Sequence, residues 1–229
     1  MIALHLRNWL RSHPRLHRAA SSVVVRFTGS YEARFERALL EAVHDAGCFW
    51  DVGANIGEYV RKVTDQGVST VVAIEPSEAC CQQLRRLPSA PLVIEAALSD
   101  EDGHASFSVN AGPLAVSNHL TRTTDQEGVG VRTSRADTLV ARGVPTPDVI
   151  KIDVEGFEGE VLDGMPLLLQ NKTLKTVCME VHFAQLQERG IGNEPARIVR
   201  VLRAAGFRVH WVDPSHLIAQ RRRADRIRN

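Results

Sequence analysis

The amino-acid sequence predicts an α/β protein built on a mostly parallel β-sheet with helices on both faces. Two observations lead to this fold class. Strand and helix patterns alternate after residue 47, and such a βαβαβ run forms parallel strands joined by right-handed crossovers. The last two strand patterns, FRVHWVD and HLIAQRR, are separated only by Pro214 and Ser215. Because so short a connection cannot cross over the sheet, this last pair must be antiparallel.

The alternating run begins with three apolar stretches that predict strands at Cys48–Val52, Thr70–Glu75 and Leu92–Leu98. Helices are expected between them, at Asn55–Val63 and Ser77–Leu87. The same patterns predict one earlier helix and four later elements: a helix at Tyr31–Ala46, a strand at Asp148–Val154, a helix at Glu158–Leu169, a strand at Leu174–Val181 and a helix at Glu194–Ala205.

The rhythm changes in the middle of the chain. Ala105–Val109 and Val129–Ala136 alternate like the strands of a hairpin or of an edge extension, with a long polar loop between them. We therefore expect one domain over residues 30–229 that carries a hairpin and loop insertion at about 104–137. A basic N-terminal arm over residues 1–29 precedes it.

Charge is unevenly distributed, although the formal net charge of the 229 residues is only +1. Residues 1–29 carry five arginines and no acid, and residues 220–229 carry five arginines against Asp225. The rest of the chain is therefore net acidic. A mildly acidic body with two basic ends is not typical of a dedicated nucleic-acid-binding protein.

Residues 1–19 predict an amphipathic helix, interrupted by Pro14, that could lie on an anionic membrane surface. More often such a segment covers its own domain or a partner subunit, and the oligomeric state stays open. The chain has neither an apolar run long enough to span a membrane nor a secretory signal pattern. Its four cysteines lack metal-ligand spacing, so we expect a reduced, cytoplasmic protein.

The segment Gly53-Ala54-Asn55-Ile56-Gly57 follows the first strand and predicts a nucleotide-binding turn at a helix N-terminus. Gly53 would permit the tight turn, and Gly57 would permit close approach or close packing. No Gly-Lys-Ser/Thr follows, and Asn55 replaces the middle glycine of the dinucleotide fingerprint. Asp51, at the end of the strand, suits a cationic or amino-bearing ligand better than a pyrophosphate.

Glu75 ends the second strand, where an acidic side chain can accept hydrogen bonds from both ribose hydroxyls. This feature serves NAD and S-adenosylmethionine alike, so it indicates adenosine binding without choosing the cofactor. The alternative is an ordinary strand-end glutamate beside Pro76. The correctly spaced glycine turn favours the ribose interpretation.

Four motifs in this order and spacing, DVGANIG, AIEP, ALSD and KIDVEGFEGEVLDG, resemble the FkbM-type S-adenosylmethionine-dependent methyltransferases. The likeness runs from about Tyr31 to His182. It implies the class I methyltransferase fold, a Rossmann-like, seven-stranded sheet whose last strand is antiparallel. It also implies a cofactor site at these residues: Asp51, Gly53, Ala54, Asn55 and Gly57 at the methionine end, Glu75 and Pro76 at the ribose, Ala97, Leu98 and Asp100 at the adenine, and Asp153 beside cofactor or acceptor.

Charged side chains also gather where the later strands end. Lys151, Asp153 and Glu155 share one face of the fourth strand by alternation, and Glu180 and His182 end the fifth. A central strand is normally apolar on both faces, so this rim predicts chemistry. Asp153 is expected to position cofactor or acceptor, and Glu155, Glu180 and His182 are candidate bases. Lys151 is expected to pair with one of the acids, with a weaker prediction that it contacts substrate.

Two further interpretations stay open at this rim. Asp153, Glu155 and Glu180 are hard oxygen donors that could coordinate magnesium, although no spacing rule demands a metal. Asn118 and His119, in the long polar loop, could contact the acceptor, but such a loop is equally often a mobile connection. His182 could likewise be a strand-end histidine bonded to a backbone carbonyl.

Methylation of a hydroxyl on a sugar, a glycan or a secondary metabolite is the function that the resemblance favours. An RNA methyltransferase is the first alternative, but VEGF stands where base-amine methyltransferases carry a Pro-Pro-aromatic turn. A nicotinamide-dependent dehydrogenase is disfavoured by Asn55 and by the antiparallel ending. A cofactor-binding domain without catalysis is disfavoured by the acidic rim.

Overall fold

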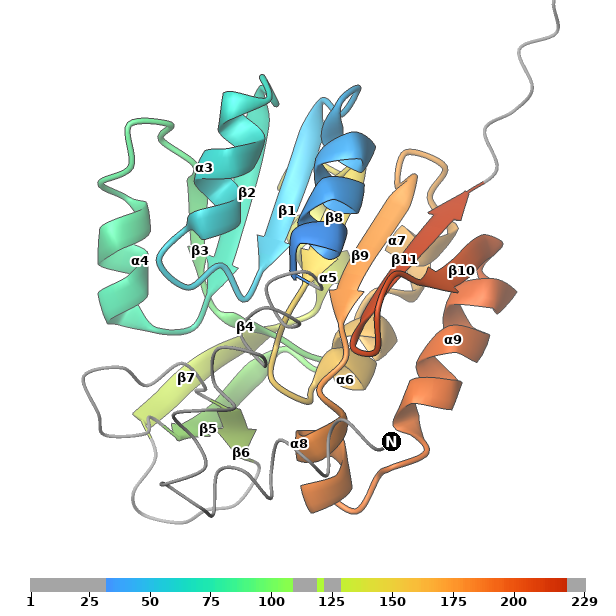
Figure 1. The fold of residues 1–229 in the computed structure, drawn as a ribbon. Coiled ribbons are helices and arrows are strands. Elements are labelled where there is room, and N and C mark those ends of the chain that lie inside the picture. The colour runs from blue at the N-terminus through green and yellow to red at the C-terminus, as the bar shows by residue number, and fades with distance from the viewer. Residues whose placement is uncertain (1–31, 109–118, 122–128, 222–229) are drawn as a thin grey trace, which may run out of the picture.

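A computed structural model describes residues 32–108, 119–121 and 129–221 (Figure 1). The expected basic arm and most of the expected polar loop lie outside the described residues. The main sheet has seven strands in the order β10-β11-β9-β8-β1-β2-β3. Only β11 runs opposite to the other six strands, which confirms the predicted mostly parallel sheet with an antiparallel last strand. The strands are β1 (Cys48–Val52), β2 (Thr70–Glu75), β3 (Leu92–Glu95), β8 (Val149–Ile152), β9 (Thr176–Glu180), β10 (Phe207–Trp211) and β11 (His216–Arg221).

Helices cover both faces of this sheet and enclose two apolar clusters (Figure 1). One cluster lies beneath the helix over residues 32–43, together with α3 (Glu58–Asp65) and α4 (Glu78–Leu84). The other lies beneath α5 (Ala136–Ala141), α6 (Glu158–Asp163), α7 (Pro166–Gln170), α8 (Phe183–Glu188) and α9 (Glu194–Ala204). Alternation along β1 explains this division, since Trp50 packs into the second cluster and Phe49 into the first.

A second sheet, in the order β4-β7-β5-β6, lies beyond the carboxyl ends of the main strands (Figure 1). Its strands are β4 (Ala97–Leu98), β5 (Gly103–Ser108), β6 (His119–Thr121) and β7 (Val129–Ser134). The expected antiparallel pairing of the two middle strands is present between β5 and β7. They form this separate sheet, however, and do not extend an edge of the main one.

Several expected boundaries differ for local physical reasons. The strand expected at Leu92–Leu98 is divided at Ala96, and β4 pairs with β7 instead of β2. The helix expected at Glu158–Leu169 is divided into α6 and α7, because Pro166 begins a new helix after Gly164 caps the first. The helix expected at Asn55–Val63 begins only at Glu58, as α3, because Asn55 and Gly57 have a left-handed backbone that cannot continue a helix. Helices α5 and α8 were not expected from the sequence pattern.

All four cysteines are free thiols. Cys80 is half-buried, and the other three, Cys48, Cys81 and Cys178, are buried. Within the part of the chain that the structure describes, no helix is both long enough and apolar enough to cross a membrane.

Candidate functional site

The turn after β1 requires residues that tolerate a left-handed backbone. Gly53, Asn55 and Gly57 have φ angles of 76°, 48° and 83°. A Cβ atom on Gly53 would lie 1.9 Å from the backbone oxygen of Asp153, so the turn can pack on the end of β8 only with glycine there. A Cβ on Gly57 would lie 2.7 Å from the Leu87 side chain, which makes Gly57 a close-packing glycine.

Glu75 is fixed beside this turn by two backbone donors. The amide of Asn55 donates to Oε2 of Glu75 and the amide of Ser77 donates to Oε1, each at 2.9 Å. The side chain lies at the end of β2 and is buried. Burial raises the pKa of Glu75, while the two backbone hydrogen bonds act against this rise. Each oxygen of an ionised carboxylate can accept a further hydrogen bond, so Glu75 can still receive two hydroxyl donors.

Lys151 is buried between two carboxylates. Its Nζ donates to Oδ1 of Asp51 and to Oδ2 of Asp153, both at 3.2 Å, and lies 4.9 Å from the ring centre of Tyr59. Burial alone would lower the pKa of Lys151, but Asp153 and Asp51 raise it above the usual range. Lys151 therefore forms the expected structural ion pair. Its donors are directed at these two acids, and a contact with substrate stays a prediction.

The two acids on Lys151 differ in their surroundings. Asp51 is 1% exposed, its pKa is raised by burial, and its Oδ2 is buried without a hydrogen-bond partner. Asp153 is partly open, and Lys151 and His182 hold its pKa below the usual range despite its burial. An oxygen without a partner is unusual on a carboxylate this deeply buried, because buried polar groups are normally hydrogen-bonded.

His182 is surrounded by four carboxylates. Its Nδ1 lies 2.7 Å from Oε1 of Glu158, whose side chain is fully buried. Its Nε2 lies 3.4 Å from Glu155, 3.6 Å from Asp153 and 4.0 Å from Glu180. Burial would lower the pKa of His182, but the hydrogen bond to Glu158 and the other acids raise it to about 9. The imidazole of His182 is therefore protonated on both ring nitrogens and positively charged at neutral pH in this arrangement. From its ordinary pKa of about 6.5 the sequence predicts instead a neutral ring that could act as a base.

The backbone after β8 directs Glu155 into this group. Glu155 has a φ of 53°, which is unusual for a residue with a side chain, and Gly156 follows at 95°. Gln185 of α8 donates to Oε2 of Glu155 at 2.9 Å. Burial raises the pKa of Glu155. Asp153, Glu155 and His182 thus offer ligand atoms that all lie within 4.8 Å of one another.

Glu180 belongs to the same rim but faces a second histidine. Its Oε2 lies 3.4 Å from Nε2 of His216, and Nδ1 of His216 lies 2.8 Å from the buried Asp213. The ring of Phe35 stacks on His216 with centroids 4.3 Å apart. With 33% of its side chain exposed, Glu180 is the most open of the four acids around His182.

Sequence reasoning missed Glu158, His216 and Asp213, which hold the rim in place. Glu158 stands three residues after Glu155 in a run of acids that predicted only a helix N-terminus. Asp213 and His216 flank Pro214 and Ser215, and this polar connection was used only to infer strand direction. A polar cluster at a turn beside the rim is the signal that could have found them.

The remaining predicted residues are less directly placed. Ala97 and Leu98 are buried in β4, and Asp100 accepts a hydrogen bond from Ser99. Asn118 lies outside the described residues, and of His119 only the backbone, in β6, is described. Their roles at the adenine and the acceptor stay predictions.

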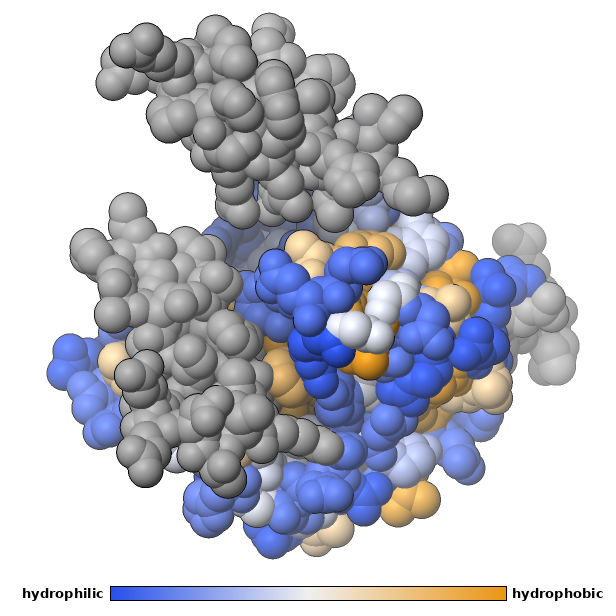
Figure 2. Space-filling view, turned by 90° about the horizontal axis from the view of Figure 1, so that it is seen from below, coloured by the Kyte–Doolittle hydropathy of each residue, from blue (hydrophilic) through white to orange (hydrophobic). Residues whose placement is uncertain are grey.

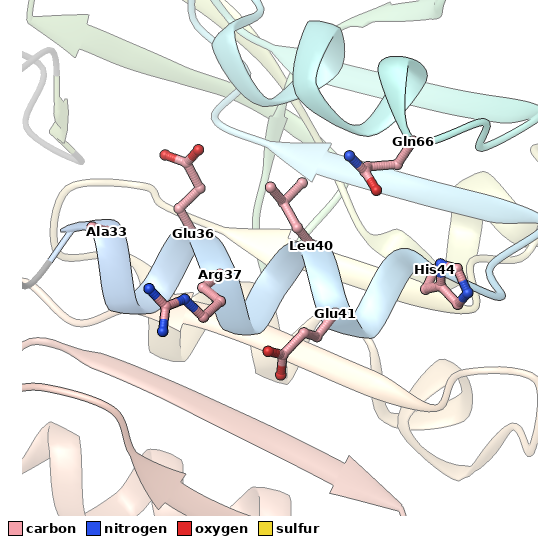
Figure 3. A pocket seen from close by; sticks show the side chains of 7 residues that line it. All are labelled: Ala33, Glu36, Arg37, Leu40, Glu41, His44 and Gln66. Atoms are coloured by element: carbon pink, nitrogen blue, oxygen red, sulfur yellow. The ribbon is translucent and has the colours of Figure 1, made fainter.

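The described surface at the carboxyl ends of the strands is largely hydrophilic (Figure 2). A separate groove follows the outer side of the helix over residues 32–43 and extends to Gln66 (Figure 3). Its lining includes Glu36, Leu40 and Glu41 but none of the predicted site residues, and Glu36 is paired there with Lys62.

Comparison with known proteins places this geometry in a family. A model of the "Methyltransferase FkbM domain" matches residues 51–209. The hexuronic acid methyltransferase AglP of Haloferax volcanii is 34% identical over 151 residues, which are 64% of this chain and 60% of that protein. The crystal structure of the methyltransferase FkbM from Methylobacillus flagellatus KT superposes with a TM-score of 0.51 at 15% identity.

The structural match covers 77% of this chain and 44% of the bacterial protein, and at that identity it supports the fold alone. The chain therefore spans 44% of the length of one of these relatives and 60% of the other. The family match includes the glycine turn, Glu75 and the whole acidic rim. The chain belongs to the FkbM methyltransferase domain family.

Proposed function

We propose that this chain is an S-adenosylmethionine-dependent methyltransferase that acts on a hydroxyl group of a sugar or glycan. The observation that carries the proposal is that two buried carboxylates lie beside the glycine turn. Glu75 is fixed by backbone donors, and one oxygen of Asp51 has no hydrogen-bond partner. Membership of the FkbM methyltransferase family supports the same reaction class.

The residues at the turn fit the proposed cofactor. Glu75 has acceptor capacity for two ribose hydroxyls, and its two backbone donors fix the direction in which it accepts. Oδ2 of Asp51 lacks a partner, and a methionine ammonium group would supply one. Gly53 keeps the backbone of the turn close to β8, which leaves its outer side for the ligand.

Methyl transfer needs an aligned acceptor and a base for the departing proton. When bound, S-adenosylmethionine supplies the methyl group: the acceptor oxygen forms the new C–O bond while the C–S bond breaks and its electron pair stays on sulfur. We assign the base role to Glu180, because it is the most open of the four acids around His182, with 33% of its side chain exposed. Like the other three acids it has a partner, since its Oε2 lies 3.4 Å from Nε2 of His216. The carboxylate of Glu180 takes up the hydroxyl proton.

A sugar acceptor is supported by AglP, whose name gives hexuronic acid as its substrate. The acidic rim favours a hydroxyl over a carboxylate as the reacting group. A hydroxyl needs a proton acceptor, which the rim offers, whereas a carboxylate needs none and would meet several like charges.

The proposed domain division and location of the protein agree with this function. We keep residues 30–229 as the methyltransferase domain with an insertion at about 104–137, and residues 1–29 as a basic arm. A cytoplasmic location fits a cytoplasmic methyl donor, and contact of residues 1–19 with a membrane surface would bring the enzyme to a lipid-linked glycan acceptor.

A screen with S-adenosylmethionine labelled in the methyl group tests the proposed acceptor. The panel contains hexuronic acid glycosides, neutral sugars, lipid-linked glycans, small phenols and RNA. The proposal predicts label in a sugar acceptor, retained after mild alkali because a methyl ether resists hydrolysis. Label that alkali releases would indicate a methyl ester instead, and label only in RNA would contradict the proposal.

A further inference from the structure

Three side chains from two strand ends converge on one small volume of the rim. Nε2 of His182 lies 3.6 Å from Oδ1 of Asp153 and 3.4 Å from Oε2 of Glu155. Ligand atoms that each lie about 2.1 Å from one ion are separated by about 3.0–3.4 Å at octahedral to tetrahedral angles. The two separations from His182 are therefore close to this range, and the three ligand atoms all lie within 4.8 Å of one another.

A second side chain holds each of the two carboxylates in this group. Lys151 binds Oδ2 of Asp153, so Oδ1 faces His182. Gln185 donates to Oε2 of Glu155, the same oxygen that faces His182, at the end of the left-handed backbone turn. These partners restrict the side chains before any ion arrives, as supporting residues do in metal sites.

The orientation of His182 is the most specific feature. Glu158, with a fully buried side chain, lies 2.7 Å from Nδ1 and is itself fixed by the amide of Gly156. Metal-binding histidines commonly donate one ring nitrogen to a carboxylate in this way, which turns the other nitrogen toward the ion. The second oxygen of Glu158 is buried without a partner, so this carboxylate is not placed for solvation.

The local charge also calls for a cation. Four carboxylates lie within 4.0 Å of the His182 ring nitrogens, and Lys151 contacts only Asp153 among them. Buried charges are normally paired or coordinate metal ions, and a divalent ion here would offset the negative charge that remains beside Lys151 on Asp153 and His216 on Glu180. Glu180 is the third oxygen donor that the sequence offers for magnesium, but its Oε1 lies 4.0 Å from Nε2 of His182 and its Oε2 lies 3.4 Å from His216.

We propose that Asp153, Glu155 and His182 bind one divalent cation and that Glu158 acts as a positioning residue for His182. Two carboxylate oxygens and one imidazole nitrogen suit Mn²⁺, which accepts both ligand types, with Mg²⁺ as the harder alternative. The site rests on the proposed function, in which the cation would hold the acceptor hydroxyl and ease its deprotonation by Glu180.

Titration of the full chain with MnCl₂ after treatment with EDTA tests this site, with the loss of the free Mn²⁺ signal followed by electron paramagnetic resonance. One Mn²⁺ per chain is expected, and pulsed measurements should detect one coordinated imidazole nitrogen. His182→Gln should remove the nitrogen signal. Glu155→Gln and Glu158→Gln should each weaken Mn²⁺ binding about 10–100-fold. Glu95→Gln, at an exposed ion pair on β3, is the matched control and should change nothing.

Calorimetric titration of each variant with S-adenosylhomocysteine separates the two proposals. A wild-type chain that binds S-adenosylhomocysteine but no Mn²⁺ would overturn the cation site and leave the methyltransferase proposal intact. A chain that binds Mn²⁺ without a nitrogen signal would overturn the ligand set. Absence of S-adenosylhomocysteine binding would instead contradict the proposed function. Should His182→Gln fail to fold, the Glu155→Gln result decides.

Discussion

Nζ of Lys151 lies 3.2 Å from Oδ1 of Asp51, and both side chains are almost completely buried, at 4% and 1% exposed. The two residues come from adjacent strands, β8 and β1, and are direct partners in the parallel register. The pair joins the expected cofactor turn to the acidic rim, because Lys151 also binds Asp153. A change in this one lysine therefore affects both halves of the site.

Lys151→Met should lower the free energy of unfolding by about 3–5 kcal/mol, because it leaves the buried Asp51 and the partly open Asp153 without their cation. Urea denaturation of the full chain measures this loss. The double variant Asp51→Asn with Lys151→Met should recover part of it, since the more deeply buried charge is then gone. A loss below about 1 kcal/mol in the single variant would contradict this assignment of the pair.

Gly53→Ala and Gly67→Ala form a matched pair, because both glycines have a left-handed backbone, with φ angles of 76° and 85°. A Cβ on Gly67 meets nothing within 4 Å, so its replacement should cost only about 1–2 kcal/mol of backbone strain. A Cβ on Gly53 meets the backbone oxygen of Asp153, so the loss should reach about 3 kcal/mol or more. Equal losses in urea denaturation would show that the turn does not pack on β8.

The stability of the protein should fall with rising pH partly because of His216. Burial acts to lower its pKa, but Glu180 and Asp213 raise it above the ordinary value of 6.5. A raised pKa stabilises the folded state below pH 6.5, and this contribution is lost as pH rises through the folded-state pKa. The difference in unfolding free energy between wild type and His216→Gln should therefore shrink as pH rises from 6.5 through the folded-state pKa of His216. A constant difference would show that His216 is not charged in the fold.

Glu180→Gln should lower kcat by about 10²–10⁴-fold with little change in KM, because it removes the proposed proton acceptor. Affinity for S-adenosylhomocysteine should be unchanged, since Asp51 and Glu75, the residues proposed to bind the methionine and ribose parts, lie on β1 and β2. The exposed Glu188 of α8 gives a matched control, and Glu188→Gln should retain full turnover. A Glu180→Gln enzyme with normal kcat would remove Glu180 from the mechanism.

Much of the fold could be predicted because short apolar runs define buried strands. Cys48–Val52 and Thr70–Glu75 have the expected bounds, since residues on both sides leave the apolar pattern. The run at Leu92–Leu98 was less informative, because Ala97 and Leu98 remain buried after the chain leaves the main sheet. Hydrophobicity records burial, and it does not record which sheet a strand joins.

The candidate site divides in the same way. Asp153, Glu155, Glu180 and His182 could be grouped from sequence because parallel strands end at one edge. The buried Glu158 could not, because an acidic residue at a helix N-terminus has an ordinary explanation in the helix dipole. The high pKa of His182 depends on the distances to its four neighbours, which no sequence spacing provides.

Calorimetric titration of the full chain with S-adenosylmethionine and with NAD is the most direct test of the proposed methyltransferase site. We expect S-adenosylmethionine to bind one per chain, and Glu75→Ala to weaken it by about 1–3 kcal/mol, the cost of removing a partner from buried hydroxyls. Glu95→Ala, at the position opposite Glu75 on β3, should bind normally. Binding of NAD in place of S-adenosylmethionine, or unchanged affinity in Glu75→Ala, would contradict the assignment.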